Sequence, residues 1–395
     1  MTVDLLRVMF PYLFLVVLYA LAMAILNSCR RFFVPAMAPA MLNIGMIWGA
    51  LVMAPWFDPP VLGLAWGVLL GGAVQLGVNV PTLRSVGYRW RPGFDVGGKG
   101  VRRVGRLMVP TVIGLAVNDI NQVVDTILAT LLAEGSVSWL YYGSRLTQLP
   151  LGLVGIAVGT AILPTLSSQS ARGETEGLKS TVGFGLRVVF YLTLPAIIGL
   201  VVLRVPITAL IFEHGEFTQA ETMATARATL WYAIGMWAAG GIRVLASAFY
   251  SIKDTRTPFL TATAAMAVNV ALNLYLMTVM AHAGLALASS LSVIFQFLLL
   301  LQLLRRSLGP LGLRSIAAGT AKMAVASAVM GAACALSLHF LPPAAGTGFA
   351  VRAGIVAGEI ALGMASYIYV SRLLGCEEYL FIADMVKKRA ARREQ

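Results

Sequence analysis

Long runs of apolar residues dominate the chain, and short charged or turn-forming segments separate them. Windows of about 19 residues place about eleven such runs, each long enough to cross a bilayer as a helix. They cover roughly residues 5–27, 33–54, 61–83, 107–132, 137–163, 185–203, 224–250, 258–280, 283–304, 315–341 and 349–373. The runs are continuous and do not alternate with a period of two, so they predict helices and not barrel strands. We expect an all-α, polytopic integral membrane bundle.

The composition favours the same class. Of the 395 residues, 58% are hydrophobic and only 12% are charged, and the mean hydropathy is +0.82. A water-soluble domain of this composition would expose a large apolar surface. The cysteines Cys29, Cys334 and Cys376 have neither paired spacing nor neighbouring histidines, so the sequence indicates neither a disulfide framework nor a zinc site.

The formal net charge of +13 is distributed unevenly along the chain. Lys and Arg concentrate in every second connection between the apolar runs, which is the pattern of cytoplasmic loops. These residues are Arg30, Arg31, Arg84, Arg89, Arg91, Lys99, Arg102, Arg103, Arg172, Lys179, Lys253, Arg256, Arg305, Arg306, Arg314, Lys387, Lys388, Arg389, Arg392 and Arg393. The alternation predicts a cytoplasmic C-terminus. Nucleic acid is not an expected partner, because no aromatic-interleaved basic face and no soluble domain are present.

The same alternation places Met1 on the outer side of the membrane. The first apolar run begins almost at once, and nothing resembles a cleavable signal peptide. We therefore expect that an odd number of upstream spans is missing from this chain. The alternative is a true outward N-terminus that the first hairpin inserts.

Three ionisable residues, Asp119, Asp125 and Arg145, lie inside two adjacent apolar stretches, Arg106–Leu132 and Val137–Leu163. A short turn separates the stretches, which indicates a helical hairpin. Asp125 and Arg145 lie about eight or nine residues from this turn, which is a depth of about 13 Å at 1.5 Å per residue. That depth is near the bilayer midplane, where ionisable groups mark a pathway, a substrate site or a mutual pair.

A small-residue ladder on the third run predicts tight helix contacts. Gly63, Gly67 and Gly71 recur every four residues, and such faces let helix backbones approach closely in lipid. We interpret this ladder as a packing feature.

Several patterned stretches resemble the MurJ/MviN family of lipid II flippases, within the multidrug/oligosaccharidyl-lipid/polysaccharide exporter superfamily. The longest is the run GSVSWLYYGSRLTQLPLG over residues 135–152. Others are FPY at 10–12, AILN at 24–27, PAMAP at 35–39 with LNI at 42–44, NDINQVVDT at 118–126, FEHGEFT at 212–218 and AFYSIKDTRTP at 248–258. The resemblance extends over essentially the whole chain.

The resemblance implies two six-helix lobes around a central cavity and two extra C-terminal helices, about fourteen spans in all. The first span here corresponds to the fourth of the family, so about three upstream spans are expected to be missing. The expected parts are the remainder of the N-terminal lobe over 1–105, the C-terminal lobe over 106–310, the extra helices over 311–375 and a basic cytoplasmic tail over 376–395. Two features depart from the family pattern: the arginine cluster and aspartate of its first spans are not in this chain, and Ser144 stands where some members have aspartate.

The implied function is the flipping of lipid II from the cytoplasmic to the periplasmic leaflet of the bacterial inner membrane by alternating access. The implied partners are lipid II, which is an undecaprenyl-diphosphate-linked muropeptide, membrane lipids and cell-wall synthesis proteins. The alternatives are an exporter of another lipid-linked oligosaccharide or of drugs, or a non-transporting fragment. A membrane enzyme is not expected, because the paired carboxylates Glu174 with Glu176 and Glu377 with Glu378 have no further acidic partners for a metal.

Arg145 is the first candidate for binding the lipid II diphosphate, and Arg243 is the second. The planar guanidinium stays charged and can bind phosphate oxygens bidentately. Two alternatives remain open: Arg145 forms a structural ion pair with Asp125, or Arg243 lies near the cytoplasmic side and extends its charge to the interface.

A cation site is the second candidate site. Asn269 and Asn273 are four residues apart on one helix face, and with Asp125 and Ser289 they offer oxygen ligands of the kind that hard cations prefer. This set looks like the sodium site described for some of these flippases, and a sodium ion is the only cofactor that the resemblance suggests. The alternative is a set of hydrogen bonds between buried amides. Glu359 in the last span has no obvious partner, and its role stays open.

Overall fold

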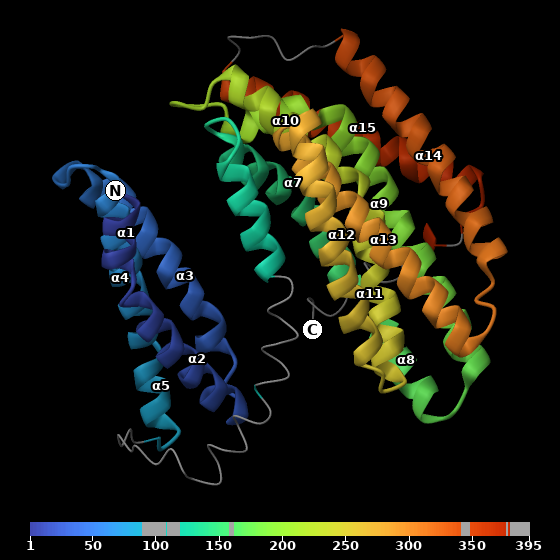
Figure 1. The fold of residues 1–395 in the computed structure, drawn as a ribbon, viewed down its shortest axis with the longest axis horizontal. Helices are drawn as coiled ribbons and strands as arrows, with labels where there is room; N and C mark the ends of the chain where they lie inside the picture. Colours follow the sequence, from blue (N-terminus) through green and yellow to red (C-terminus); the bar gives the residue numbers. More distant parts are fainter. Residues whose placement is uncertain (89–107, 109–118, 158–161, 341–347, 377, 380–395) are drawn as a thin grey trace. The chain divides into compact units, whose positions relative to one another are not determined.

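The computed structural model describes residues 1–88, 108, 119–157, 162–340, 348–376 and 378–379. These residues form helices and their connections, and no strand occurs among them. The chain divides into two compact units, unit 1 over Met1–Arg103 and unit 2 over Val104–Gln395, which are coloured from blue to red along the chain in Figure 1. The expectation of an all-α membrane bundle is confirmed.

Unit 1 contains three of the predicted spans. Its elements are α1 (Thr2–Met9), α2 (Tyr12–Ser28), α3 (Phe33–Trp48), the π-helical turn η1 (Gly49–Met53), the 3₁₀ turn η2 (Ala54–Trp56), α4 (Val61–Gly77) and α5 (Asn79–Ser85). The helical segments Val3–Ser28, Phe33–Trp56 and Val61–Ser85 are each long and apolar enough to cross a membrane.

Glycines bring α3 and α4 into close contact. A Cβ atom at Gly67 would lie 2.6 Å from the Gly45 carbonyl oxygen and 2.8 Å from the Gly49 Cα atom. Only hydrogen atoms fit between backbones at this separation, so a side chain on either helix would force them apart. The predicted packing role of the small-residue ladder is confirmed.

Tyr19 links α2 to α3 at a point where α3 lacks one hydrogen bond. Pro39 lies inside α3 and has no N–H to donate to the Pro35 carbonyl one turn earlier. The Tyr19 hydroxyl donates to that carbonyl oxygen at 3.0 Å. The bond satisfies a buried acceptor that the proline would otherwise leave unpaired.

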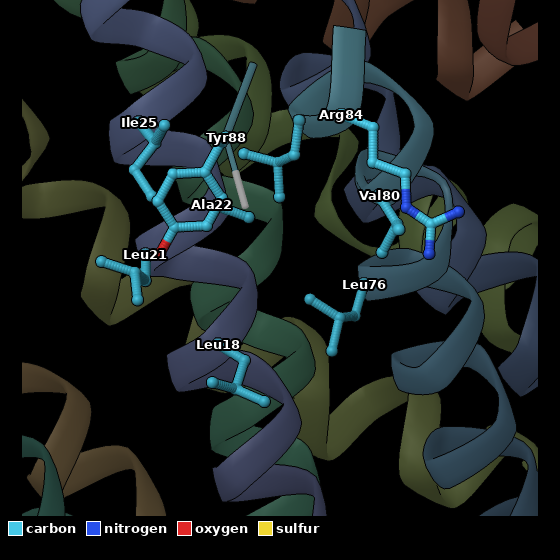
Figure 2. Close-up of a pocket in the computed structure, with 9 residues that line it drawn as sticks. Leu18, Leu21, Ala22, Ile25, Leu76, Val80, Arg84 and Tyr88 are labelled. Atoms are coloured by element: carbon cyan, nitrogen blue, oxygen red, sulfur yellow. The ribbon is translucent and has the colours of Figure 1, made fainter. Parts of the chain in front are cut away.

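An apolar groove of about 500 Å³ runs between α2 and the α4–α5 segment. Figure 2 shows the side chains of α2 on one wall and those of α4 and α5 on the other. Arg84 and Tyr88 lie at one end of the groove and are the polar members of its lining.

Unit 2 contains a helix over residues 119–130 followed by α7 to α15. Their bounds are α7 (Ser136–Ala157), α8 (Leu163–Ala171), α9 (Thr175–Phe212), α10 (Gln219–Ile234), α11 (Met236–Ser251), α12 (Arg256–Met280), α13 (His282–Leu308), α14 (Leu313–Phe340) and α15 (Phe349–Leu373). In the described part of the chain, nine helical segments are long and apolar enough to span a membrane, and each coincides with a predicted run. The predicted runs 107–132 and 137–163 lie partly outside the described residues.

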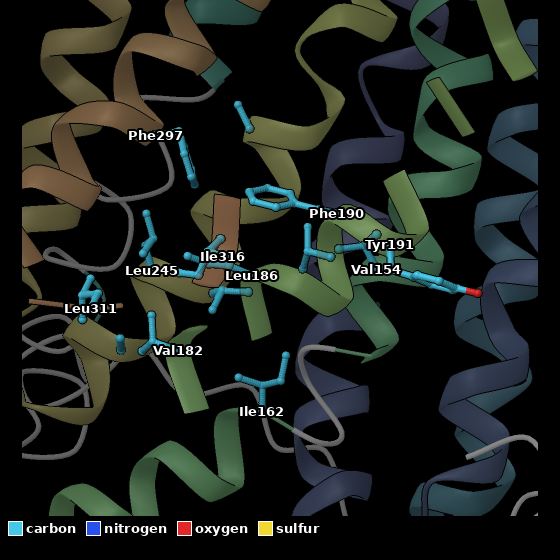
Figure 3. Close-up of a cluster of buried hydrophobic side chains, with 14 of the residues drawn as sticks. Val154, Ile162, Val182, Leu186, Phe190, Tyr191, Leu245, Phe297, Leu311 and Ile316 are labelled. Atoms are coloured by element: carbon cyan, nitrogen blue, oxygen red, sulfur yellow. The ribbon is translucent and has the colours of Figure 1, made fainter. Parts of the chain in front are cut away.

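Helix α9 is the centre of unit 2 and contacts α7, α8, α10, α11, α14 and α15. Its 38 residues extend for about 57 Å at 1.5 Å per residue, well beyond the predicted run 185–203. The core around it contains Phe190, Trp237 and Phe297, whose rings meet edge to face, together with buried aliphatic side chains (Figure 3). In lipid, such packing contributes through van der Waals contact and not through expulsion of water.

The predicted run 224–250 is divided in the structure. Gly235 separates α10 from α11, and its N–H bonds to Tyr232 instead of Trp231. The Trp231 carbonyl is thereby released from the helix ladder, and the Ser290 hydroxyl of α13 donates to it at 2.6 Å. Ser290 also lies close enough that a Cβ atom at Gly235 would be 2.9 Å from its Cα atom. The partner on α13 therefore makes the break tolerable inside a membrane.

The segment from α14 to Tyr379 is attached to α9 at more than one point. At one end, Arg352 of α15 forms an ion pair with Glu213 at 3.5 Å. In the first half of α9, Arg187 pairs with Glu378, beyond α15, at 2.7 Å. Between them, the Tyr367 hydroxyl donates to the Tyr191 carbonyl at 2.9 Å. These contacts, together with the packing of α14 on α9, make α14 and α15 part of unit 2.

Candidate functional site

The structure brings together the four residues that the sequence predicts as cation ligands. Asn273 of α12 donates through Nδ2 to Asp125 Oδ1 at 2.6 Å and to Asn269 Oδ1 at 2.8 Å. The Ser289 hydroxyl of α13 lies 3.5 Å from Asp125 Oδ2. Three helices therefore meet at one small polar cluster within unit 2. Whether the cluster holds a cation stays a prediction.

Asn121 joins this cluster, although the sequence analysis did not select it. Asn121 precedes Asp125 by four residues, and the two therefore share a face of the helix over residues 119–130. The Asn269 amide presents one atom to both residues, at 3.0 Å from Asn121 Oδ1 and 2.9 Å from Asp125 Oδ1. The i, i+4 spacing of Asn121 and Asp125 is the sequence signal that could have identified it.

The orientation of the Asn269 amide determines what the cluster can do. If its nitrogen faces Asn121 and Asp125, the nitrogen donates a hydrogen bond to each of them, and the bond that Asn269 Oδ1 accepts from Asn273 is lost. If its oxygen faces them, oxygens of Asn121, Asp125 and Asn269 converge, and Asn273 Nδ2 donates to the last two. Oxygens of this kind are ligands that hard cations accept. Asn273 Oδ1 is also buried, and no described residue donates to it.

The chemistry of the cluster suits a monovalent cation better than a divalent one. Amide and hydroxyl oxygens surround a single carboxylate, that of Asp125. Hard cations accept these oxygen ligands. One negative charge balances one monovalent cation, whereas a divalent ion would leave an uncompensated charge at this depth.

Arg145 lies on an exposed face of α7. Its guanidinium donates to the Gln148 side-chain oxygen and to the Tyr141 hydroxyl, each at 3.1 Å, and lies 4.9 Å from the centre of the Tyr141 ring. These partners are neutral and belong to its own helix. No ion pair joins Arg145 to Asp125, although the structure describes both residues. The ion-pair alternative is therefore wrong for this conformation.

Arg243 of α11 directs its guanidinium toward α7. Nη1 donates to the Leu151 carbonyl at 3.1 Å. A Cβ atom at Gly155 would collide with that same nitrogen. The guanidinium can occupy this space because Gly155 has no side chain. The residue is exposed, and no described carboxylate pairs with it.

Comparison with known proteins gives consistent matches over both units. The sequence model of the family described as "Lipid II flippase MurJ" matches residues 1–355. A probable lipid II flippase MurJ of Vibrio cholerae is 38% identical over 375 residues, which cover 94% of this chain and 71% of that protein. The lipid II flippase MurJ of Burkholderia cenocepacia is 34% identical over 310 residues, which cover 78% of this chain and 60% of that protein.

A solved structure agrees with the sequence matches. The structure titled "Lipid II flippase MurJ, inward closed conformation" superposes with a TM-score of 0.76 at 25% identity, covering 97% of this chain and 75% of that chain. The matched region is 58% of the length of the Haemophilus influenzae relative, which is 38% identical over 294 residues. The chain therefore spans between about three fifths and three quarters of the proteins it matches.

Proposed function

Because the chain belongs to the MurJ family of lipid II flippases, we propose that it moves lipid II from the cytoplasmic to the periplasmic leaflet of a bacterial cytoplasmic membrane. The family is one of transporters, and the chain is a multi-pass membrane protein. Translocation by alternating access and a cytoplasmic C-terminus are part of the proposal. The family match over residues 1–355 is the observation that carries it.

The two exposed arginines supply the chemistry that this substrate requires. Lipid II carries a diphosphate, and a guanidinium binds phosphate oxygens through two parallel hydrogen bonds. The hydrogen bonds of Arg145 and Arg243 go to neutral oxygens, and no carboxylate in the described part of the chain pairs with either guanidinium. Arg243 is bound to Leu151, about 9 Å along α7 from Arg145. We propose that both act on one lipid II headgroup.

We propose further that Asp125, Asn121, Asn269, Asn273 and Ser289 hold one monovalent cation, with sodium as the candidate. The oxygens that converge when the Asn269 oxygen faces Asn121 and Asp125 support this, as does Asn273 Oδ1, to which no described residue donates. A cation that binds only the folded protein stabilises it. Sodium chloride should therefore raise the Tm of the purified chain relative to choline chloride at equal ionic strength.

The matched variants for that comparison are Asp125→Asn and Glu174→Gln. Asp125→Asn should abolish the sodium-dependent rise in Tm, whereas Glu174→Gln, at an exposed site beside Arg172, should retain it. A sodium effect of equal size in both variants would show that the ion acts elsewhere.

Complementation tests the proposed function in cells. In a bacterium depleted of its own lipid II flippase, expression of this chain should restore growth. Arg145→Ala and Arg145→Lys should both fail to restore growth, although both proteins still insert into the membrane. Alanine removes the charge, and lysine lacks the planar fork. Arg172→Gln, at an exposed site at the end of α8, is the control and should complement. Failure of the wild-type chain to restore growth at normal membrane levels would contradict the proposal.

A further inference from the structure

A polar pocket of about 220 Å³ lies between α9, α14 and the segment that follows α15. It belongs to neither site described above. The charged side chains in its lining are those of Arg187, Lys322 and Glu378, and the Ser315 hydroxyl joins them. Positive charges therefore outnumber negative ones among the described lining residues.

The end of α15 brings Glu378 to this pocket. Gly375 has a φ of +65°, and the N–H groups of Gly375 and Cys376 bond back to carbonyls in the last turn of α15 at 3.1 and 3.0 Å. Such a pair of bonds around a left-handed glycine ends a helix and turns the chain away from its axis. Beyond the turn, Glu378 accepts a hydrogen bond from Arg187 Nε at 2.7 Å, and its side chain is only 5% exposed.

Contacts on two sides fix the orientation of Arg187. Glu378 engages Nε, and the Ser315 hydroxyl accepts a weaker bond from Nη1 at 3.4 Å. A Cβ atom at Gly319 would lie 3.0 Å from Arg187 Cδ, so the arginine packs on α14 where that helix has no side chain. No described residue accepts a hydrogen bond from Nη2. The guanidinium therefore keeps a donor for a ligand.

Lys322 is the second cation of the pocket. Ser315, Gly319 and Lys322 are spaced by four and three residues and therefore share one face of α14. The Lys322 side chain is exposed, and no described carboxylate forms an ion pair with it. With Glu378 balancing Arg187, the charge of Lys322 is uncompensated. The pocket is therefore suited to an anion with a single charge, and it would repel a metal cation.

The pocket lies at the expected boundary of the hydrocarbon core. Arg187 is in the first turn of the predicted apolar run 185–203, and Lys322 is within about two turns of the start of the run 315–341. The basic connections at Arg172 and Arg314 precede these runs and indicate the cytoplasmic side. The phosphate groups of a bilayer lie just outside its hydrocarbon core. Lipid headgroups are therefore the anions nearest to this pocket.

We propose that this pocket binds the phosphate of one anionic phospholipid from the cytoplasmic leaflet. Basic pockets between transmembrane helices on the cytoplasmic side are suited to anionic headgroups. The Arg187 guanidinium and the Lys322 ammonium group donate charge-assisted hydrogen bonds to phosphate oxygens. A phosphodiester has one negative charge, which matches the one uncompensated positive charge. The bound lipid contacts α9, α14 and the end of α15 together, and it therefore stabilises the folded protein.

The Tm of the purified full chain in a maltoside detergent tests this proposal without the use of lipid II. Dihexanoyl phosphatidylglycerol should raise the Tm in a saturable way, whereas dihexanoyl phosphatidylcholine, whose headgroup has no net charge, should not. Inorganic phosphate at the same concentration should have little effect, because it has no acyl chain to hold it at the membrane boundary. A rise as large with inorganic phosphate would identify a soluble phosphate as the ligand and would overturn the assignment to a lipid.

Lys322→Gln and Arg306→Gln are the matched variants. Arg306 is an exposed cation in the last turn of α13 and is not part of the pocket. Lys322→Gln should weaken the binding of phosphatidylglycerol about tenfold, because one charge-assisted hydrogen bond is lost. Lys322→Arg keeps the charge and should retain binding, as should Arg306→Gln. Equal weakening by Lys322→Gln and Arg306→Gln, or a wild-type Tm that phosphatidylglycerol does not change, would overturn the proposal.

Discussion

At the scale of single residues, Gly155 positions Arg243. The guanidinium of Arg243 occupies the space where a side chain at position 155 would lie, and it bonds to Leu151 from there. Gly155→Ala should displace the guanidinium and remove that bond. The displaced guanidinium should also lose a hydrogen bond to the diphosphate, which is worth about 1.5 kcal/mol or more, so lipid II should bind about tenfold more weakly.

Gly152→Ala is the matched control for this prediction. Gly152 lies on the same helix, but a Cβ atom there would meet nothing within 4 Å. Lipid II affinity, measured by titration of the reconstituted chain, should be unchanged in this variant. Equal losses in the two variants would indicate a general effect on α7 and not on Arg243.

The sequence identified most of the candidate residues through one physical argument, the cost of ionisable or amide groups inside apolar runs. That argument selected Asp125, Arg145 and the Asn269–Asn273 pair, and the structure brings Asp125 and the pair together. Asn121 was missed because its role depends on an amide from another helix. The partners of Arg145 were also unpredictable, because side-chain contacts within a helix depend on rotamers.

At the scale of elements, the contact between α3 and α4 depends on glycine. Gly67→Ala would place a Cβ atom 2.6 Å from the Gly45 carbonyl oxygen, where only backbone could give way. Overpacking of this kind costs about 1–3 kcal/mol. Gly77→Ala is the control on the same helix, because nothing lies within 4 Å of its Cβ position.

Thermal unfolding in detergent measures the difference between these two variants. The Tm should fall in Gly67→Ala and should stay level or rise in Gly77→Ala, where alanine favours the helix. Similar unfolding temperatures for the two variants would contradict the close packing of α3 on α4.

Asp254 makes the start of α12 sensitive to pH. The Thr257 hydroxyl donates to Oδ2 at 2.6 Å, and the backbone N–H groups of Arg256 and Thr257 donate to Oδ1 at 3.0 Å. These bonds, that of the Thr257 side chain first, hold the pKa of Asp254 below its usual value. A carboxyl group whose pKa is lower in the folded state stabilises the fold above its unfolded pKa of about 3.9.

The contribution of Asp254 should therefore disappear as the pH falls through its lowered pKa. Above about pH 4, the Tm of wild type should exceed that of Asp254→Asn, and at lower pH the two curves should converge. Asp254 is partly exposed and solvent screens it, so the difference should be small. A constant difference across the whole pH range would show that the negative charge has no part in capping α12.

Hydropathy predicted where the spans lie but not how they are built. The break at Gly235 depends on the Ser290 hydroxyl of a distant helix, and no local pattern reports that contact. The length of α9 was underestimated because its N-terminal end is helical without being apolar, and because the predicted run stops before Arg204 although the helix continues to Phe212. Helical extensions beyond the hydrocarbon core are fixed by packing, which a window of hydrophobicity does not include.

At the scale of the whole molecule, the distribution of Lys and Arg predicts the orientation. The connection before α9, with Arg172, should be cytoplasmic, and the connection after it, with His214, should be periplasmic. Single cysteines replacing Arg172 and His214, in a background without Cys29, Cys334 and Cys376, should label from opposite sides. Labelling of both from one side would exclude this topology.

The family could be recognised from the sequence because long patterned stretches match it in order. Such stretches determine which helices pair and where polar groups lie, so proteins that share them also share the fold. The substrate contacts could not be deduced in the same way, because they depend on how side chains such as Arg145 meet a ligand. The candidate substrate site therefore stays a prediction that transport must test.

Flipping of lipid II by the reconstituted chain tests the proposed function most directly. Fluorescent lipid II in proteoliposomes should become accessible to an impermeant quencher at a rate that depends on the chain. Arg145→Lys should reduce this rate to the level of protein-free vesicles, and Arg172→Gln should not. Adding Asp125→Asn to Arg145→Gln should not restore flipping, because the two side chains have separate partners. Absence of flipping by the wild-type chain, or full activity in the double variant, would contradict the account.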